Sequence, residues 1–259
     1  MPFPQHSKKH REEALFTPRH FFRYLRGLGE VVPRAPSTVI LCFTPRLTKF
    51  AVEELHFTPA SGVPREFILR TPRGPLGLVE TQGIGAPALA VTAEELMARG
   101  ARRLISVGFA AGLQTHLSVG TTVLCTKAVR DEGTSYHYVP AGKYALPSRP
   151  LSARLGRRLE SQGVRVARGA TWTVDAIYRE TLAEVRTYRK EGVLTVDMEA
   201  SALFSIGRAH GVEAAAVFSI SDLLEETGWE PRFHEARTHL QELLKRTVIA
   251  LGGGRPGLR

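Results

Sequence analysis

Two carboxylates that follow short apolar segments are the residues of this chain best suited to chemistry. Glu199 comes directly after VLTVDM, and Asp222 ends the apolar run AAAVFSIS. An ionised carboxylate can accept two hydrogen bonds at once, which suits two neighbouring hydroxyl groups. A carboxyl group at the partly buried end of a strand is a candidate general acid. We therefore expect Glu199 to bind a diol and Asp222 to transfer a proton.

Both carboxylates also have a purely structural interpretation. Glu199 would stand in the first turn of a helix, where the helix dipole stabilises a carboxylate that caps it. Asp222 would suit a helix N-cap or a surface turn after a strand. The small-residue stretch 108–112 is similarly ambiguous, because it allows either close packing or the approach of a ligand to backbone N–H groups. Spacing alone leaves these alternatives open.

Short β-branched apolar runs alternate with longer helical patterns along the chain, which predicts an α/β fold with a mixed, largely parallel central sheet flanked by helices. We expect strands at Thr38–Phe43, Leu76–Thr81, Arg103–Val107, Thr121–Ala128, Val193–Val196 and Ala214–Ile220. We expect helices at Leu47–Leu55, Pro87–Arg99, Leu151–Gln162, Thr181–Lys190, Met198–His210 and Pro231–Leu251. In such sheets ligands bind outside the carboxyl ends of the strands, where Glu199 and Asp222 both fall.

Length and composition predict a single domain. The chain has 259 residues, of which 43% are hydrophobic, enough for one substantial core. We expect a basic N-terminal extension at 1–32, the domain at 33–251 and a flexible tail at 252–259. No apolar stretch is long enough to span a bilayer or to serve as a signal peptide, so we expect a cytoplasmic protein without a membrane partner.

The formal net charge of +10 raises the possibility of nucleic-acid binding. However, 28 of the 35 basic residues are arginines scattered over the whole chain, and no recognition-helix or stacking motif accompanies them. We therefore expect no nucleic-acid partner and favour either an arginine-rich surface or an affinity for a small phosphorylated ligand. Cys42 and Cys125 lack the spacing of a metal site or a disulfide framework, so we expect core thiols and no metal.

Several motifs together resemble a known family. GIGAPALAVTAEEL, SVGFAAGLQ, RDEGTSYHY and VDMEASALF followed by SISD are similar to the nucleoside phosphorylase family. This family contains uridine phosphorylases, hexameric purine nucleoside phosphorylases and methylthioadenosine nucleosidases, and the resemblance covers about 33–251. It implies a phosphorylase-like fold, a pentosyltransferase that transfers the ribosyl group of a nucleoside to inorganic phosphate and releases the free base without another cofactor, and a homo-oligomer, either a dimer or a hexamer of dimers.

The resemblance also implies roles for individual residues. Met198 and Glu199 would bind the ribose, and Asp222 would protonate or hydrogen-bond a purine leaving group. Pyrimidine-specific members carry a Gln-x-Arg pair where this chain has Thr181 and Ala183, which favours a purine-like base. We expect Trp172 and Tyr178 to stack on the base, with a place in the core as the alternative, and Arg179 or Glu180 could read another base edge.

The phosphate site departs most from the family pattern. The resemblance implies that Arg46, Arg65 from a neighbouring subunit and the Gly108 backbone hold phosphate. An arginine and a hydroxyl residue of the family are replaced by Ser106 and Phe109. The hydrolytic branch uses a glutamate near the first strand, and TPRLTKF offers none. Phosphorolysis is therefore the leading hypothesis, followed by hydrolysis, a nucleoside-binding homologue with little catalysis, and a basic nucleic-acid-associated protein.

Overall fold

A mixed sheet of eleven strands forms the centre of the computed structural model, which describes residues 4, 6 and 8–254. Its strands run in the order β11-β10-β6-β8-β9-β5-β1-β4-β3-β2, with β7 beside β6. The strands are β1 (Thr38–Cys42), β2 (Thr58–Pro59), β3 (Glu66–Thr71), β4 (Gly74–Glu80), β5 (Arg103–Gly112), β6 (Thr122–Asp131), β7 (Tyr144–Ala145), β8 (Val166–Val174), β9 (Val193–Asp197), β10 (Glu213–Glu225) and β11 (Gly228–Pro231).

The sheet curls on itself through β5 and β10. β5 pairs in parallel with β1 and β10, and its last two residues pair with β9 in the antiparallel sense. Since β10 also pairs with β6, the strands β5, β10, β6, β8 and β9 close into a ring. The longest registers, β10 with β5 and β6 with β8, are parallel. The mixed, largely parallel sheet expected from the sequence is confirmed.

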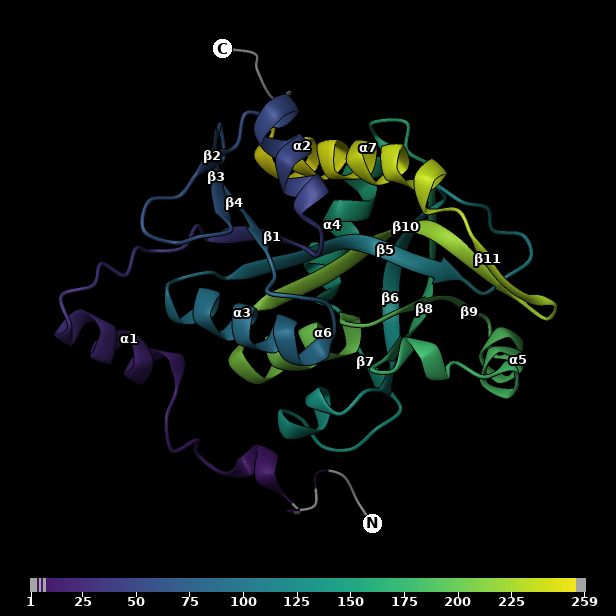
Figure 1. The fold of residues 1–259 in the computed structure, drawn as a ribbon, viewed down its shortest axis with the longest axis horizontal. Helices are drawn as coiled ribbons and strands as arrows, with labels where there is room; N and C mark the ends of the chain where they lie inside the picture. The colour runs from purple at the N-terminus through teal and green to yellow at the C-terminus, as the bar shows by residue number, and fades with distance from the viewer. Residues whose placement is uncertain (1–3, 5, 7, 255–259) are drawn as a thin grey trace.

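Helices cover both faces of this sheet (Figure 1). They are α1 (Pro18–Gly27), α2 (Pro45–Leu55), α3 (Ala86–Ala98), α4 (Arg149–Glu160), α5 (Leu182–Lys190), α6 (Ala200–His210) and α7 (Phe233–Gly252). Short 3-10 turns are η1 (Lys9–Arg11), η2 (Thr134–His137) and η3 (Ile177–Arg179). One core cluster packs α3 and α6 against one face, and another packs α2, α4 and α7 against the other.

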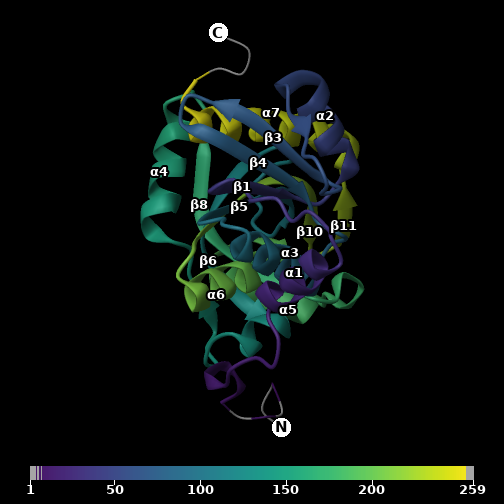
Figure 2. The same cartoon turned by 90° about the vertical axis from the view of Figure 1, so that its left-hand side faces the viewer.

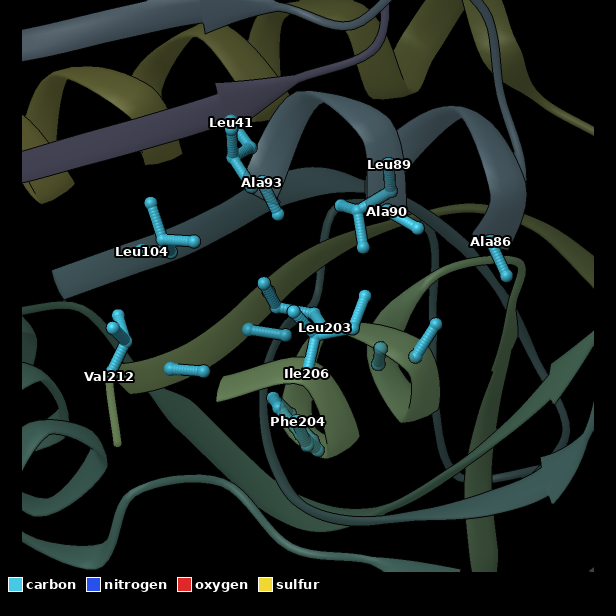
Figure 3. Packing of buried hydrophobic residues seen from close by; sticks show 14 of the residues in the cluster. Leu41, Ala86, Leu89, Ala90, Ala93, Leu104, Leu203, Phe204, Ile206 and Val212 are labelled. Atoms are coloured by element: carbon cyan, nitrogen blue, oxygen red, sulfur yellow. The ribbon is translucent and has the colours of Figure 1, made fainter. Parts of the chain in front are cut away.

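The contact between α3 and α6 helps to position Glu199, one of the two carboxylates of interest. Leu89 and Ala93 of α3 face Leu203 and Ile206 of α6 in one buried cluster (Figure 3). Burying leucine and isoleucine side chains stabilises the fold by roughly 1.5–3 kcal/mol each. This packing fixes the N-terminal ends of both helices, and Glu199 directly precedes α6.

Every strand and helix expected from the sequence is present, but several elements were missed. β8, the β2–β3 segment, β7, β11 and α1 were not expected. β8 contains Gly169 and an arginine, which interrupt its apolar pattern. A side chain at Gly169 would overlap Leu194, so the glycine is required for the close approach of β9. β10 extends beyond Ile220 to Glu225 because it forms a hairpin with β11.

The N-terminal segment lies outside the two helix layers and contacts the domain through α1 (Figure 2). Phe22 is the buried residue of α1, and its ring lies 5.9 Å from the guanidinium carbon of Arg99, just after α3. The division into 1–32, 33–251 and 252–259 remains a prediction, and residues 255–259 of the expected tail lie outside the described residues. Within 8–254, no helix is long and apolar enough to cross a bilayer.

Candidate active site

A cavity of about 550 Å³ opens at the carboxyl ends of β5, β9 and β10. Met198, Glu199 and Asp222 all line it, so the structure brings together the ribose and base residues expected from the sequence. Glu199 and Asp222 are each only 7% exposed. The segments that follow β1 and β4 complete the wall with Thr44 and Ile84.

Glu199 occupies the N-cap position of α6, but its side chain forms no capping hydrogen bond there. Asp197 caps the helix, since its Oδ2 accepts hydrogen bonds from the backbone N–H groups of Glu199 and Ala200 at 2.9 and 2.7 Å. Glu199 Oε1 instead accepts from the N–H of Gly85, the N-cap residue of α3, at 2.5 Å. The carboxylate is therefore held at the N-terminal end of a different helix, with its other oxygen available to a ligand.

Burial disfavours the charged form of the Glu199 carboxyl group. Desolvation is the main cause that raises its pKa to about 8, and the nearby Asp197 carboxylate adds to the shift. The Gly85 N–H bond opposes the shift, as would any further donor to the carboxylate. A bound diol would supply two such donors and so favour the ionised form.

Asp222 is directed into the cavity by an irregularity of β10. The register between β10 and β5 shifts between Ile220 and Asp222, which leaves Ser221 as the extra residue of a bulge. Bulges of this kind re-aim side chains. The Ser221 hydroxyl donates to Asp222 Oδ1 at 2.5 Å, and the indole Nε1 of Trp229 donates to Oδ2 at 2.7 Å. Asp222 is thus a buried, oriented carboxyl group and neither a helix cap nor a surface turn residue.

Glu180 adds another carboxyl group at the mouth of the cavity. Burial, followed by the charges of Asp222 and Glu184, raises its pKa to about 7. Glu180 and the proposed base residue Asp222 line the same cavity. The sequence suggested Glu180 only as one alternative reader of a base edge, and its neighbour Arg179 does not line the cavity.

The remaining wall is apolar where the family pattern would bind phosphate. The ring of Phe43 lies close to Gly108. A side-chain carbon placed at Gly108 would come within 3.1 Å of this ring. Phe109 packs edge-on against Phe233 with ring centroids 6.0 Å apart. Among the residues that line the cavity are four carboxyl groups and no lysine, arginine or histidine.

The two arginines expected at the phosphate lie outside this wall. Arg46 is exposed at the start of α2, next to the lining residue Thr44, whose hydroxyl accepts from its backbone N–H at 3.4 Å. Arg65 is half exposed and donates from Nη1 to Glu80 Oε1 and to the Thr81 carbonyl, both at 3.5 Å. Within one subunit neither guanidinium lines the cavity. For Arg46 this differs from the expectation that its own subunit's side chain holds phosphate there.

The two aromatic residues expected at the base have different surroundings. Tyr178 lines the mouth of the cavity and is 94% exposed. Trp172 does not line it. Trp172 is fully buried, donates from Nε1 to Asp131 at 2.8 Å and packs on Tyr188 with ring centroids 4.7 Å apart. The expectation that Trp172 stacks on the base is corrected to its alternative, a place in the core.

Trp229, Gly85 and Phe43 are the site residues that the sequence did not reveal. Trp229 belongs to a hairpin whose pairing with β10 is not visible in a hydrophobic pattern. Gly85 follows an expected strand and so lay near the predicted site, but no role was assigned to its N–H; its positive φ of 96° is a conformation that glycine favours. Phe43 ended an expected strand and gave no signal of its contact with Gly108.

The fold and the cavity match a known class of protein. The family model described as "Phosphorylase superfamily" matches residues 37–251. The chain therefore belongs to the phosphorylase superfamily, and the resemblance found in the sequence motifs is confirmed.

Individual relatives fall on both the pyrimidine and the purine side. The chain is 32% identical to the uridine phosphorylase of Treponema pallidum (strain Nichols) over 157 residues, which cover 56% of this chain and 60% of that protein. It is 28% identical to a DeoD-type purine nucleoside phosphorylase of Bacillus thuringiensis (strain Al Hakam) over 174 residues, covering 64% and 72% respectively.

Solved structures show the same architecture over nearly the whole domain. The uridine phosphorylase from Vibrio fischeri ES114, complexed with 6-hydroxy-1-naphthoic acid, superposes with a TM-score of 0.75 at 27% identity, covering 88% of this chain and 98% of that one. The purine nucleoside phosphorylase from Toxoplasma gondii in complex with immucillin-H also gives a TM-score of 0.75, at 22% identity, covering 86% and 96%. The latter likeness concerns the fold alone.

Proposed function

We propose that this protein is a nucleoside phosphorylase. It cleaves the N-glycosidic bond of a nucleoside with inorganic phosphate and releases the free base and ribose 1-phosphate. The observation that carries this proposal is that Glu199 and Asp222, both freed from capping roles, face one cavity of a phosphorylase-superfamily fold.

The two carboxyl groups suit the two halves of the substrate. Cleavage of the glycosidic bond develops positive charge on the ribose and negative charge on the departing base. Glu199 would accept hydrogen bonds from the ribose hydroxyls beside Met198, and Asp222 would supply a proton or a hydrogen bond to the base. The Ser221 and Trp229 donors hold Asp222 in position before the substrate arrives.

The base is proposed to be a purine or a purine-like ring. Thr181 and Ala183 replace the pair that reads uracil in the pyrimidine-specific relatives. Asp222 and Glu180 instead present carboxyl oxygens, which accept hydrogen bonds from ring N–H or amino groups when ionised. Tyr178 at the mouth is proposed to stack on the base.

Phosphate requires cations that one subunit does not place in the cavity wall. We propose that Arg46 turns toward Thr44 and that Arg65 is supplied by a second copy of the chain, as part of a dimer or a hexamer of dimers. Guanidinium groups bind phosphate through paired hydrogen bonds, so two of them would offset the charge of the dianion. The backbone of Gly108 is proposed as a further contact, although Gly108 lies within β5 opposite Phe218.

The apolar wall also supports a second candidate function, hydrolysis of the same bond. A cavity lined by carboxyl groups and aromatic rings without a cation excludes a free dianion more readily than it excludes water. The hydrolytic reaction would give ribose instead of ribose 1-phosphate.

One experiment separates these functions. The purified protein is incubated with inosine, adenosine, guanosine, uridine and methylthioadenosine, with and without phosphate, and the free base is measured by chromatography. Release that depends on phosphate supports the phosphorylase, and equal release without phosphate supports the nucleosidase. A thermal shift with nucleoside but no release indicates a binding protein.

We also propose a co-substrate, a location and partners for this protein. Inorganic phosphate is the co-substrate, and no organic cofactor or metal takes part. The protein acts in the cytoplasm on small-molecule nucleosides and has no nucleic-acid or membrane partner.

A further inference from the structure

A second cavity, of about 180 Å³, lies between α6 and the segment from Val139 to Leu146. It shares no lining residue with the first cavity. Arg130 at the end of β6 and Ser205 and Arg208 of α6 supply its polar wall, and Phe204 and Tyr144 supply apolar surface. No acidic residue lines it.

Arg130 is a buried guanidinium without a counterion among the described residues. It is 6% exposed, and its Nε and Nη1 donate to the Ser135 hydroxyl at 2.9 Å and the Pro140 carbonyl at 2.7 Å. Nη2 also donates to the Val139 carbonyl at 3.5 Å, and the guanidinium carbon lies 4.2 Å from the centre of the Tyr136 ring. None of these partners carries a negative charge. The nearby Glu132 accepts from the Ser135 N–H and the Ser201 hydroxyl and forms no ion pair with Arg130. Buried charges are normally paired, so an external anion would complete this arrangement.

Two further groups on α6 point to the same ligand. Ser205 is 2% exposed, and its hydroxyl has no hydrogen-bond partner within the described part of the chain. Arg208 stands three residues later, on the same side of the helix. Its side chain forms no ion pair with another described residue, and its charge acts on Arg130 and lowers the pKa of that guanidinium, after burial as the main cause. An anion between the arginines would remove this repulsion.

We propose that the second cavity binds the phosphate group of a small molecule, either inorganic phosphate or a sugar phosphate ester. Two guanidinium groups and a hydroxyl present donors from different directions. This arrangement suits a tetrahedral oxyanion with three acceptor oxygens better than a planar carboxylate. The cavity is large enough for a phosphate group but smaller than the volume typical of sites for larger ligands.

This inference does not rest on the proposed function. None of the residues that form the second cavity belongs to the ribose, base or phosphate groups assigned to the first. Loss of the anion site would therefore leave nucleoside cleavage intact, and failure of the proposed reaction would leave the anion site intact.

The test is an equilibrium titration of the full chain with inorganic phosphate in the absence of nucleoside. We expect Arg208→Gln to weaken binding at least about tenfold, because a charge-assisted contact is lost. Arg157→Gln, which removes an exposed arginine of α4 and the same charge, is the matched control and should change binding less than about twofold. Identical titrations of the two variants would overturn the proposal.

Arg46→Gln separates the second cavity from the first. We expect this variant to retain the phosphate site that Arg208→Gln removes, and Arg208→Gln to retain nucleoside cleavage. Loss of the phosphate site in Arg46→Gln alone would assign the bound anion to the first cavity and contradict the proposal.

Two measurements identify the ligand and its place. Crystals soaked in tungstate should show the heavy atom between Arg130 and Arg208, whereas a carboxylate of a second copy at that position would refute an anion site. Because ribose 1-phosphate is also the proposed product of the first cavity, the comparison uses the affinity lost in Arg208→Gln. A loss at least about tenfold larger for ribose 1-phosphate than for phosphate identifies the ester as the ligand of the second cavity, and an equal or smaller loss identifies inorganic phosphate. Binding of neither at millimolar concentration would contradict the proposal.

Discussion

Asp197 caps the start of α6, whereas Glu199, two residues later, faces the cavity. Asp197 accepts four hydrogen bonds, from two backbone N–H groups and from the hydroxyls of Thr171 and Thr173. Those donors satisfy a completely buried acid and fix the start of α6. Glu199 is held by fewer donors, the Gly85 N–H and the backbone of Met198. At the scale of residues, the site therefore separates a structural carboxylate from a binding one.

The raised pKa of Glu199 makes its replacement testable in two ways. Between pH 4.5 and about 8 the folded protein holds a proton at Glu199 that the unfolded chain releases. The free energy of unfolding from this group therefore falls as pH rises through that window. We expect Glu199→Gln to be increasingly stabilised relative to the unmodified protein from pH 5 to pH 8.5, as measured by Tm. Its cleavage rate should fall at least about 100-fold.

The control for this prediction is Glu54→Gln, which removes an exposed acid of α2 away from the cavity. It should show no such gain at high pH. A Tm difference for Glu199→Gln that is constant with pH would contradict the buried, proton-holding state, and full activity would exclude the contact with the ribose.

Asp222 is predicted to act on the base. Asp222→Asn should reduce purine nucleoside cleavage about 100-fold or more and pyrimidine nucleoside cleavage far less, because a purine leaving group gains most from a proton at its ring nitrogen. The measurement is kcat/KM for inosine and uridine. Equal losses with both substrates would show that Asp222 is structural. Trp229→Phe, which removes the 2.7 Å indole donor, should reproduce a smaller part of the purine-selective loss.

At the scale of elements, α6 and α4 each contain a glycine, and the surroundings of the two glycines differ. A side-chain carbon at Gly207 in α6 would come within 2.8 Å of the Val212 carbonyl and 3.0 Å of Ala214. At Gly156 in α4 the same carbon would meet only the end of the Arg168 side chain. The backbone carbonyl cannot move without displacing β10, whereas an arginine can change rotamer.

These two glycines make a matched pair. Alanine is favoured over glycine in helices by about 1 kcal/mol, so Gly156→Ala should be neutral or stabilising by up to that amount. Gly207→Ala should destabilise by about 1–3 kcal/mol, because the steric overlap exceeds the gain in helix propensity. Urea unfolding with unchanged m values measures both. A stabilised Gly207→Ala would contradict the close packing of α6 on β10.

The elements also show how far the sequence could predict the molecule. Apolar periodicity located the parallel strands β1, β4, β5, β6, β9 and β10 and the helices between them, because these elements bury continuous or one-sided apolar surface. It missed β8, which approaches β9 closely because Gly169 has no side chain. It also missed β11, which forms a hairpin with β10. Glu199 and Asp222 could be identified from the sequence because each directly follows an apolar run. Trp229 and the Phe43 contact with Gly108 could not, since they arise only when distant segments fold together.

At the scale of the whole molecule, the net charge of +10 contrasts with a cavity whose wall contains carboxyl groups and no cation. The positive charge lies outside the first cavity, on exposed arginines such as Arg46 and Arg65. We therefore propose that a second copy of the chain provides part of the phosphate site.

Subunit mixing tests this proposal. Arg65→Gln and Glu199→Gln should each be inactive as pure proteins if Arg65 acts on a neighbouring site. In a mixed dimer, the site that keeps Glu199 receives Arg65 from the other subunit. Random mixing after dissociation should therefore restore activity to about a quarter of that of the unmodified protein. An inactive mixture whose subunits have exchanged would contradict a shared site.

The central claim is that the glycosidic bond is broken by phosphate. The most direct measurement follows the sugar product by phosphorus NMR while inosine and phosphate are incubated with the purified protein. The account predicts a sugar 1-phosphate signal that grows in step with released hypoxanthine and disappears with Glu199→Gln. Hypoxanthine release accompanied by free ribose and no sugar phosphate would contradict it.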